Sequence, residues 1–287
     1  MIENNMISGS KSKTLGIEFN HLYVTLDPET LDSIDQSEFI SQEFCTISRD
    51  TVKTDTESWT GIYLRGKNAY LELFPPGGAE GLREGFSGIG FNSQQSGEMD
   101  IVQEKLRSLL ESKGLLGSKE ILSDLQVRQT EAGKVPWFHY LSINPAEREA
   151  FASWLMEFHQ DYLEYKNIKL TSDGCFNRAA YLKTLDTSET SLFDDISEVH
   201  LELTLSEQEE LALLLQSFGY ESSSVGDITI YRSHGFIVQV CQKVAPRYRI
   251  RKVVCTLKEQ FQMEKTFTFG KNAQLNVGRS LAILEFG

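Results

Sequence analysis

Two short segments decide the fold: Phe19-Asn20-His21-Leu22-Tyr23-Val24 and Tyr70-Leu71-Glu72-Leu73-Phe74. Both alternate between two kinds of side chain, as strands with two different faces do. Each also carries one residue of a metal-ligand type in its middle, His21 in the first and Glu72 in the second. The pattern predicts that Phe19, His21 and Tyr23 share one face of the first strand. The Leu and Val side chains share the other face and are expected to lie against a helix.

A helix and two more strands are predicted between these segments. Asp27-Pro28 supplies an N-cap and a first-position proline for a short helix that reaches about residue 34. Residues 43–53 and 59–65 are predicted strands. Pro75-Pro76-Gly77-Gly78 ends the strand that contains Glu72. The order is therefore βαβββ over residues 17–75.

A second unit of the same kind is predicted over residues 86–143, with strands at 87–92, 122–130 and 135–143 and a helix at 98–112. It is one strand short of the first unit. Asn144-Pro145-x-Glu147 has the pattern of a helix start. With the aromatic stripe that follows, it predicts a long core helix over 145–166. Residues 144–193 are therefore interpreted as a helical connection.

A third unit begins in residues 194–287. Glu198–Leu205 alternates like a strand, Ser206-Glu207-Gln208-Glu209 has the form of a capping box, and the helix after it ends at Gly219. Strands follow at 227–232, 236–242, 249–257, 266–269, 272–277 and 281–286. The order of elements indicates an internal duplication in which His21 corresponds to His200 and Glu72 to Gln239.

The composition excludes several classes of function. A formal net charge of −13 and a pI of about 4.9 disfavour nucleic acid and anionic membrane surfaces as partners. The four cysteines are dispersed, which disfavours a thiolate zinc site and favours reduced thiols in the cytoplasm. Residues 1–16 are polar and are expected to be a disordered tail, and no apolar run is long enough to span a membrane.

The βαβββ order, together with Asn20-His21-Leu22-Tyr23-Val24 and Tyr70–Phe74, resembles the vicinal oxygen chelate superfamily. This superfamily includes glyoxalase I, bleomycin- and fosfomycin-resistance proteins and extradiol dioxygenases. The resemblance is strongest over 17–75, extends over 86–143 and returns in degenerate form over 194–287. It implies an α+β fold of repeated βαβββ (glyoxalase-like) units, which form cupped mixed sheets with helices on the outer face, in a monomer or a homodimer.

The resemblance also implies a divalent metal ion, such as Zn, Fe, Mn or Ni, held by His21 and Glu72. Such an ion is a Lewis acid for a small molecule with vicinal oxygens, and Glu72 could move a proton as the catalytic group. A catalytic site usually has three protein ligands. The second unit has Ser87-Gly88-Ile89-Gly90 where the next ligand is expected. His139, His200 and Glu285 remain candidates.

Substrate contacts are predicted on the same face as His21 and Glu72, in an aromatic concavity of the kind that binds small molecules. The candidates are Tyr23, Tyr63, Arg65, Tyr70 and Phe74. Arg65 would bind a carboxylate or a phosphate. Structural roles stay open beside these: a hydrogen-bonded core histidine for His21, a salt bridge to Arg65 for Glu72, and a surface position for Arg65 itself.

Three functions follow as alternatives. The first is a metal-dependent lyase, isomerase, dioxygenase or thiol transferase. The second is a metal-free protein that binds a drug or metabolite, with an aromatic or cationic ligand held by the aromatic side chains. The third is a scaffold that has lost its catalytic site, which Gly88 and Gln239 favour because each stands where a ligand would be expected.

Overall fold

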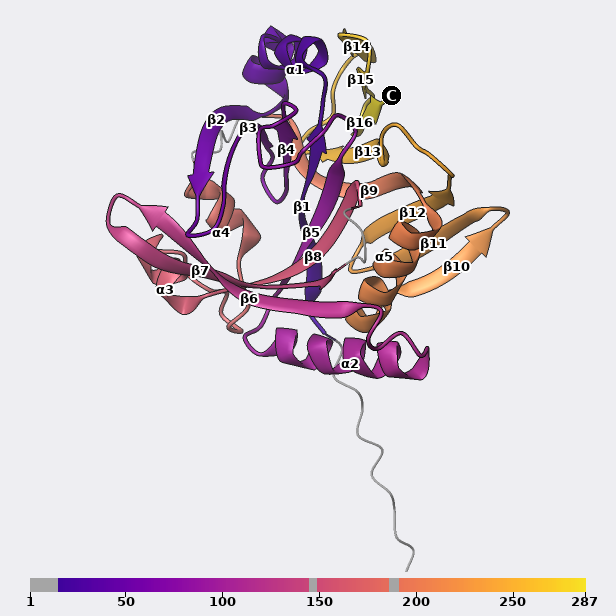
Figure 1. Cartoon of the computed structure of the whole chain (residues 1–287). Coiled ribbons are helices and arrows are strands. Elements are labelled where there is room, and N and C mark those ends of the chain that lie inside the picture. The colour runs from indigo at the N-terminus through magenta and orange to yellow at the C-terminus, as the bar shows by residue number, and fades with distance from the viewer. Residues whose placement is uncertain (1–14, 145–148, 186–190) are drawn as a thin grey trace, which may run out of the picture.

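The computed structural model describes residues 15–144, 149–185 and 191–287, which form two eight-stranded mixed sheets (Figure 1). The first sheet has the order β2-β3-β4-β1-β5-β8-β7-β6. Its strands are β1 (Ile17–Thr25), β2 (Thr46–Lys53), β3 (Ser58–Arg65), β4 (Tyr70–Phe74), β5 (Ser87–Ser93), β6 (Glu120–Thr130), β7 (Gly133–Asn144) and β8 (Phe151–Phe158). The predicted tail lies outside the described residues up to position 14, whereas Leu15 is buried.

The second sheet has the order β10-β11-β12-β9-β13-β16-β15-β14, which repeats the strand order of the first. Its strands are β9 (Phe193–Leu203), β10 (Glu221–Val225), β11 (Ile228–Ser233), β12 (Phe236–Gln242), β13 (Ile250–Leu257), β14 (Lys265–Phe269), β15 (Ala273–Val277) and β16 (Leu281–Phe286). At the centre of each sheet, the first strands of two units pair antiparallel, β1 with β5 and β9 with β13. The predicted α+β class with repeated glyoxalase-like units is confirmed.

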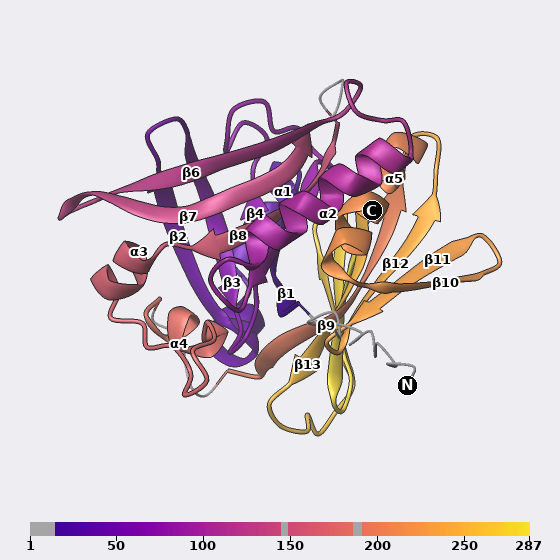
Figure 2. The same ribbon diagram turned by 90° about the horizontal axis from the view of Figure 1, so that it is seen from below.

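One apolar core joins the two sheets. It takes side chains from both sheets and from the helices α1 (Pro28–Asp35), α2 (Glu98–Ser112) and α5 (Leu205–Phe218). Phe19 of β1 stacks on Phe236 of β12 with ring centroids 4.3 Å apart, and helices α2 and α5 lie side by side where the sheets meet (Figure 2). Thr46 of β2 follows a short π-helical turn, η1 (Ile40–Phe44). None of the described helices is long and apolar enough to cross a membrane.

The predicted long helix over 145–166 is wrong. Residues 145–148 lie outside the described part of the chain, residues 151–158 form strand β8, and only α3 (Gln160–Tyr165) is helical. Strand β8 runs parallel to β5 and antiparallel to β7, so it is the fourth strand that the second unit was expected to lack. The segment interpreted as a helical connection thus begins with a strand of the first sheet.

The fourth unit has no helix. Residues 258–264 are all described, and they connect β13 to β14 without helical structure. In the other three units the last strand runs parallel to the first, as β4 does to β1. In the fourth unit, β16 runs antiparallel to β13. Omitting one segment removes one reversal of the chain, and the last strand therefore points the other way.

A β-bulge divides β1. The pairing with β5 shifts between Phe19 and His21, so Asn20 is the extra residue. Phe19 consequently belongs to the shared core together with Leu22, whereas His21 points to the opposite face. The prediction that Phe19 shares a face with His21 and Tyr23 is wrong, because strict alternation does not hold across a bulge.

Candidate functional site

The first sheet curves around a cavity of about 1130 Å³, which we call the first cup. Its lining includes every substrate-contact or ligand candidate from the first unit: His21, Tyr23, Tyr63, Arg65, Tyr70, Glu72 and Phe74. Helix α4 (Arg178–Lys183) lies over part of the cup, and its Tyr181 also lines the cavity. Strand pairing explains the grouping, since His21 lies opposite Tyr70 and Tyr23 lies opposite Glu72 on adjacent strands.

The imidazole of His21 is held by two buried asparagines. Asn20 Nδ2 donates to Asn92 Oδ1 over 2.7 Å, which leaves Asn20 Oδ1 to accept a hydrogen bond. His21 Nδ1 lies 2.8 Å from that oxygen and therefore carries the proton. Burial lowers the pKa of His21 to about 3, so the ring is neutral. Its Nε2 lone pair is thus free to face the cup.

Aromatic rings fix the same imidazole from two sides. Tyr70 stacks on His21 with ring centroids 4.6 Å apart, and Trp154 approaches it edge-on at 5.3 Å. A Cβ atom at Gly90 would lie 2.8 Å from His21 Cε1 and 2.9 Å from Trp154 Cζ2. A side chain at Gly90 would therefore displace the ring or the indole, and glycine is needed for this close approach.

Glu72 is the carboxylic acid of the cup. Burial raises its pKa to about 8, an effect that the charges of Arg65 and Arg128 partly offset. Its Oε1 atom lies 3.9 Å from His21 Nε2. The alternative of a salt bridge to Arg65 is not supported, because no ion pair within 4.0 Å joins these two described residues. Glu72 and His21 therefore meet as two neutral groups at neutral pH.

Two arginines reach the first cup. Arg65 of β3 is 6% exposed, donates from Nη1 to the carbonyl of Leu185 over 2.8 Å, and lies 5.3 Å from the Tyr63 ring. This burial contradicts the alternative of a surface position for Arg65. Arg128 of β6 lies over the Trp137 ring at 4.7 Å and donates to the Tyr162 hydroxyl over 3.2 Å. Both side chains bring cationic groups next to aromatic side chains of the cavity.

A metal centre needs a third ligand, and the remaining candidates lie elsewhere. His139 on β7 is exposed and does not line the first cup. His200 and Glu285 line a separate cavity on the second sheet. In the residues that the structure describes, no group of three His, Cys, Asp or Glu side chains is placed to hold a metal ion. Of the predicted ligands, the first cup brings together His21 and Glu72.

The register shows which residues of the second unit lie beside His21. His21 pairs with Gly90 of β5, and Tyr23 pairs with Gly88. Trp154 of β8 lies opposite Gly90. Neither a glycine nor an indole offers a side-chain ligand for a metal ion. These residues do not fit a metal site with three protein ligands.

The model of the family of unknown function DUF5829 matches residues 19–286. The chain belongs to this family. Among curated proteins, none has a sequence that matches this DUF5829 chain.

The solved structures that match the DUF5829 chain include the following two. A hypothetical protein from Staphylococcus aureus is 14% identical with a TM-score of 0.55, over 88% of this chain and 95% of that one. A fusion of a xylose isomerase-like TIM barrel with a 4-hydroxyphenylpyruvate dioxygenase is 10% identical with a TM-score of 0.39, over 80% of this chain and 32% of that one. At these identities the first likeness concerns the arrangement of strands only.

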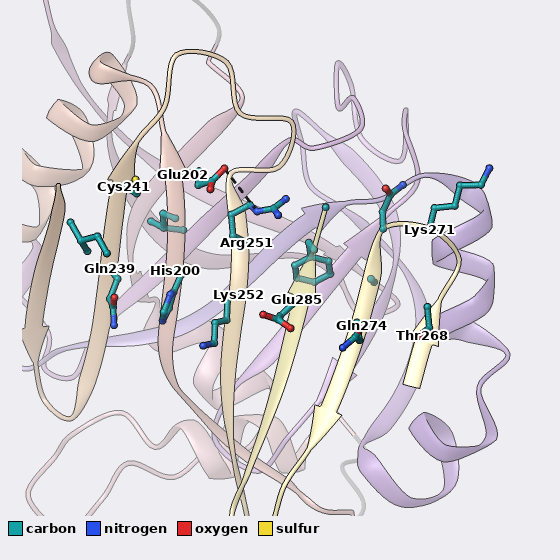
Figure 3. A pocket seen from close by; sticks show the side chains of 16 residues that line it. His200, Glu202, Gln239, Cys241, Arg251, Lys252, Thr268, Lys271, Gln274 and Glu285 are labelled. Carbon is teal, nitrogen blue, oxygen red and sulfur yellow. Dashed lines mark ion pairs between the residues drawn. The ribbon is translucent and has the colours of Figure 1, made fainter. Parts of the chain in front are cut away.

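The second sheet of the DUF5829 chain carries its own cavity of about 460 Å³, the second cup (Figure 3). A polar row crosses five adjacent strands there, because the register aligns the following residues: Gln239, His200, Lys252, Glu285 and Gln274. His200 Nε2 bonds to Glu198 Oε1, which also accepts a hydrogen bond from Gln239 Nε2 over 2.7 Å. The two cups thus differ in their central residues, which are largely aromatic around His21 in the first cup and polar in the second.

The proposed correspondence between His21 and His200 is inconsistent with the register. Glu72 lies opposite Tyr23, and Gln239 lies opposite His200. If Gln239 is matched to Glu72, then His200 matches Tyr23. The N-caps agree, since His21 and Glu198 both lie six positions before a capping residue, Asp27 and Thr204 respectively. Glu198 therefore occupies the position of His21 in the second sheet.

The sequence did not reveal several residues of the first cup. Trp154 was assigned to a helix, so its alternation with Met156 and Phe158 along β8 was not used, although all three line the cavity. Arg128 lies in a strand that was predicted, and it alternates with Gln126, which also lines the cup. This alternation was the available signal for Arg128.

Proposed function

We propose that this chain is a metal-independent binding protein of the vicinal oxygen chelate superfamily, and that it holds a small molecule with a planar aromatic part in the first cup. The observation that carries the proposal is an aromatic-lined cavity of about 1130 Å³ with buried donors that lack an acceptor. Small-molecule sites usually measure roughly 300–1,000 Å³, with a few polar groups among apolar walls. The repeated strand order supports the superfamily assignment.

The polar atoms of the cup support a ligand that accepts hydrogen bonds. Trp137 Nε1 and Arg65 Nε are buried without a hydrogen-bond partner in the described structure. An unpaired buried donor costs about 1–3 kcal/mol, so such groups are expected to be satisfied when the protein is in use. A bound ligand that offers acceptors to these atoms would supply the missing bonds.

The donor set disfavours the metal-dependent enzyme as the main function. His21 and Glu72 provide two of the three protein ligands that a catalytic metal usually has. Gly88, Gly90 and Trp154 lie on the neighbouring strands β5 and β8 and offer no further side-chain ligand.

Intrinsic fluorescence tests the proposal directly, because all three tryptophans of the chain, Trp59, Trp137 and Trp154, line the first cup. Titration with naphthalene, indole and quinoline compounds is expected to give saturable quenching and to raise the melting temperature. Zn²⁺, Mn²⁺, Fe²⁺ and Ni²⁺ are expected to leave the melting temperature unchanged.

A matched pair of variants locates the binding. Trp59 is half-buried and stacks on Trp137 with centroids 6.2 Å apart, so Trp59→Leu is expected to weaken binding severalfold without unfolding the chain. Phe261→Leu, at a half-buried aromatic that packs on Phe39, is the control. A thermal shift with metal ions that disappears in His21→Ala would contradict the proposal and restore the metal-dependent alternative.

A further inference from the structure

Arg65 is a buried cation that forms no ion pair with a carboxylate in the described part of the chain. Only 6% of the residue is exposed, and its guanidinium group has five N–H donors. One of them is satisfied by the Leu185 carbonyl, and Nε has no acceptor among the residues that the structure describes. No Asp or Glu among the described residues lies within 4.0 Å of it. An arginine in this state is either costly to the fold or kept for an anion that arrives from outside.

Arg128 places a second guanidinium group in the same cavity. It contacts aromatic side chains, through the Tyr162 hydroxyl and the face of Trp137, and it makes no ion pair within 4.0 Å to a described carboxylate. Asp50 acts on it only over a longer distance. Arg65 and Arg128 both act electrostatically on Glu72, so their charges reach the same region of the first cup.

From this arrangement we infer that the ligand of the first cup is an aromatic carboxylate, whose anionic group is bound by Arg65 in the region that Arg128 also reaches. The inference rests on the proposed small-molecule function and names its ligand class. A guanidinium group binds a carboxylate through two parallel hydrogen bonds, and Arg65 Nε with one Nη offers the required fork. The planar part of the ligand packs among Tyr70, Trp137 and Trp154.

The charges next to Arg65 and Arg128 oppose the net charge of the chain. A net charge of −13 favours cationic ligands at long range, and an aromatic or cationic ligand was one of the expectations from sequence. The lining of the cup also includes carboxyl side chains, which are those of Asp50, Asp55, Glu57, Glu72, Glu80, Glu149, Glu207 and Glu210. Neither arginine makes an ion pair within 4.0 Å to a described carboxylate, so a ligand group bound directly at Arg65 meets positive charge at the shortest range.

A series of three naphthalene probes separates charge from shape in the unmodified protein. 2-Naphthoate is an anion, 2-naphthamide is neutral and 2-naphthylmethylammonium is a cation, and the aromatic part is the same in all three. Tryptophan quenching and calorimetry are expected to show 2-naphthoate binding at least tenfold more tightly than the other two. Equal or tighter binding of the amide or the ammonium compound would overturn the inference and leave the proposed function standing.

Failure of all three probes to change tryptophan fluorescence would contradict the proposed function itself.

Variants then assign the anion site. Arg65→Met and Arg128→Met are expected to weaken 2-naphthoate binding at least tenfold and threefold, respectively, and to leave 2-naphthamide unchanged. Arg251→Met, at an arginine that lines the second cup, is the matched control. If Arg65→Met does not fold, Arg128→Met and the probe series still decide. If the arginine variants lose equal affinity for all three probes, the assignment of the anion site to Arg65 and Arg128 is overturned.

Discussion

At the scale of single residues, His21 and Glu72 are both neutral when the pH is near 7. Burial lowers the pKa of His21 to about 3 and raises that of Glu72 to about 8. Two ionisable groups can therefore stand 3.9 Å apart in an aromatic cavity without a buried charge. Their presence in apolar strands indicated a site in the sequence, but their protonation states depend on burial that no local pattern reveals.

The pKa of Glu72 predicts that the protein loses stability as the pH rises. Between the unfolded value of about 4.3 and the folded value of about 8, the native state binds one more proton than the unfolded state. The free energy of unfolding therefore falls with pH in this window, by at most about 1.4 kcal/mol per unit. Urea denaturation at pH 5 to 8 should show that Glu72→Gln lacks this decline.

The control for this experiment is Glu285→Gln, at an exposed carboxylate of the second cup. It should keep the slope of the unmodified protein. His21 acts on the acid side, where its lowered pKa means that stability falls as the pH drops from about 6.5 toward 3. Parallel stability profiles for Glu72→Gln and the unmodified protein over pH 5 to 8 would show that Glu72 is ionised in the fold.

Gly90→Ala is predicted to destabilise the protein by about 1–3 kcal/mol, because the new Cβ lies within 3.0 Å of the His21 and Trp154 rings. Trp154→Ala removes one of these contacts, so the double variant should lose less than the sum of the two single losses. Gly278→Ala is the control, since its Cβ would meet nothing closer than 3.4 Å. Additive losses in denaturant titrations would argue against a direct clash with the indole.

At the scale of elements, most helices and strands could be predicted from alternation and capping residues, and β8 shows where this fails. Phe151 and Leu155 of β8 face the shared core, whereas Trp154, Met156 and Phe158 face the first cup. A strand that is apolar on both faces shows no alternation with a period of two. The spacing of its apolar residues also fitted the stripe of a helix. The short strand β10 was not predicted, because the serine-rich sequence Glu221–Val225 has weak strand character.

Helix α5 begins two residues earlier than predicted, and its first turn forms an ion pair with the segment before β13. Thr204 is the N-cap and forms a capping box with Glu207, in place of the predicted Ser206 and Glu209. Glu207 is also buried and pairs with Arg249 over 3.0 Å. The sequence pattern gave the helix but not this ion pair, which depends on tertiary contact with the segment before β13.

Two substitutions at this helix start should differ in cost. Thr204→Ala is expected to lower the free energy of unfolding by about 1 kcal/mol, the usual value of an N-cap. Glu207→Ala should cost about 3–5 kcal/mol, because it also leaves Arg249 without its carboxylate. Denaturant titration of both variants measures the difference. Equal losses would mean that the Arg249 ion pair adds nothing beyond the cap.

At the scale of the molecule, the two sheets depend on a single core. Phe19 of the first sheet packs on Phe236 of the second, and Phe91 of β5 packs on Phe218 of α5. The repeated units could be predicted from element order, but their arrangement around one core could not, because it depends on contacts between distant segments. The same limit applies to the cup, where β3 and the turn after α4, 120 residues apart in the chain, bring Arg65 and Leu185 together.

The shared core predicts one cooperative unfolding transition for both sheets. Phe19→Ala is expected to lower the free energy of unfolding by about 3–5 kcal/mol. Tryptophan fluorescence reports the first sheet only, and far-UV circular dichroism reports both. The two transitions should coincide before and after the substitution. A shift in fluorescence alone would show that the sheets unfold independently.

The extra residue at Asn20 also affects how relatives should be compared. Before Asn20, the odd-numbered residues of β1 face the core. After Asn20, the odd-numbered residues face the cavity. A relative that lacks this residue can keep every other letter of the segment and yet present a different set of side chains to the cavity. The length of this one strand is therefore a more sensitive marker of a shared binding surface than the histidine within it.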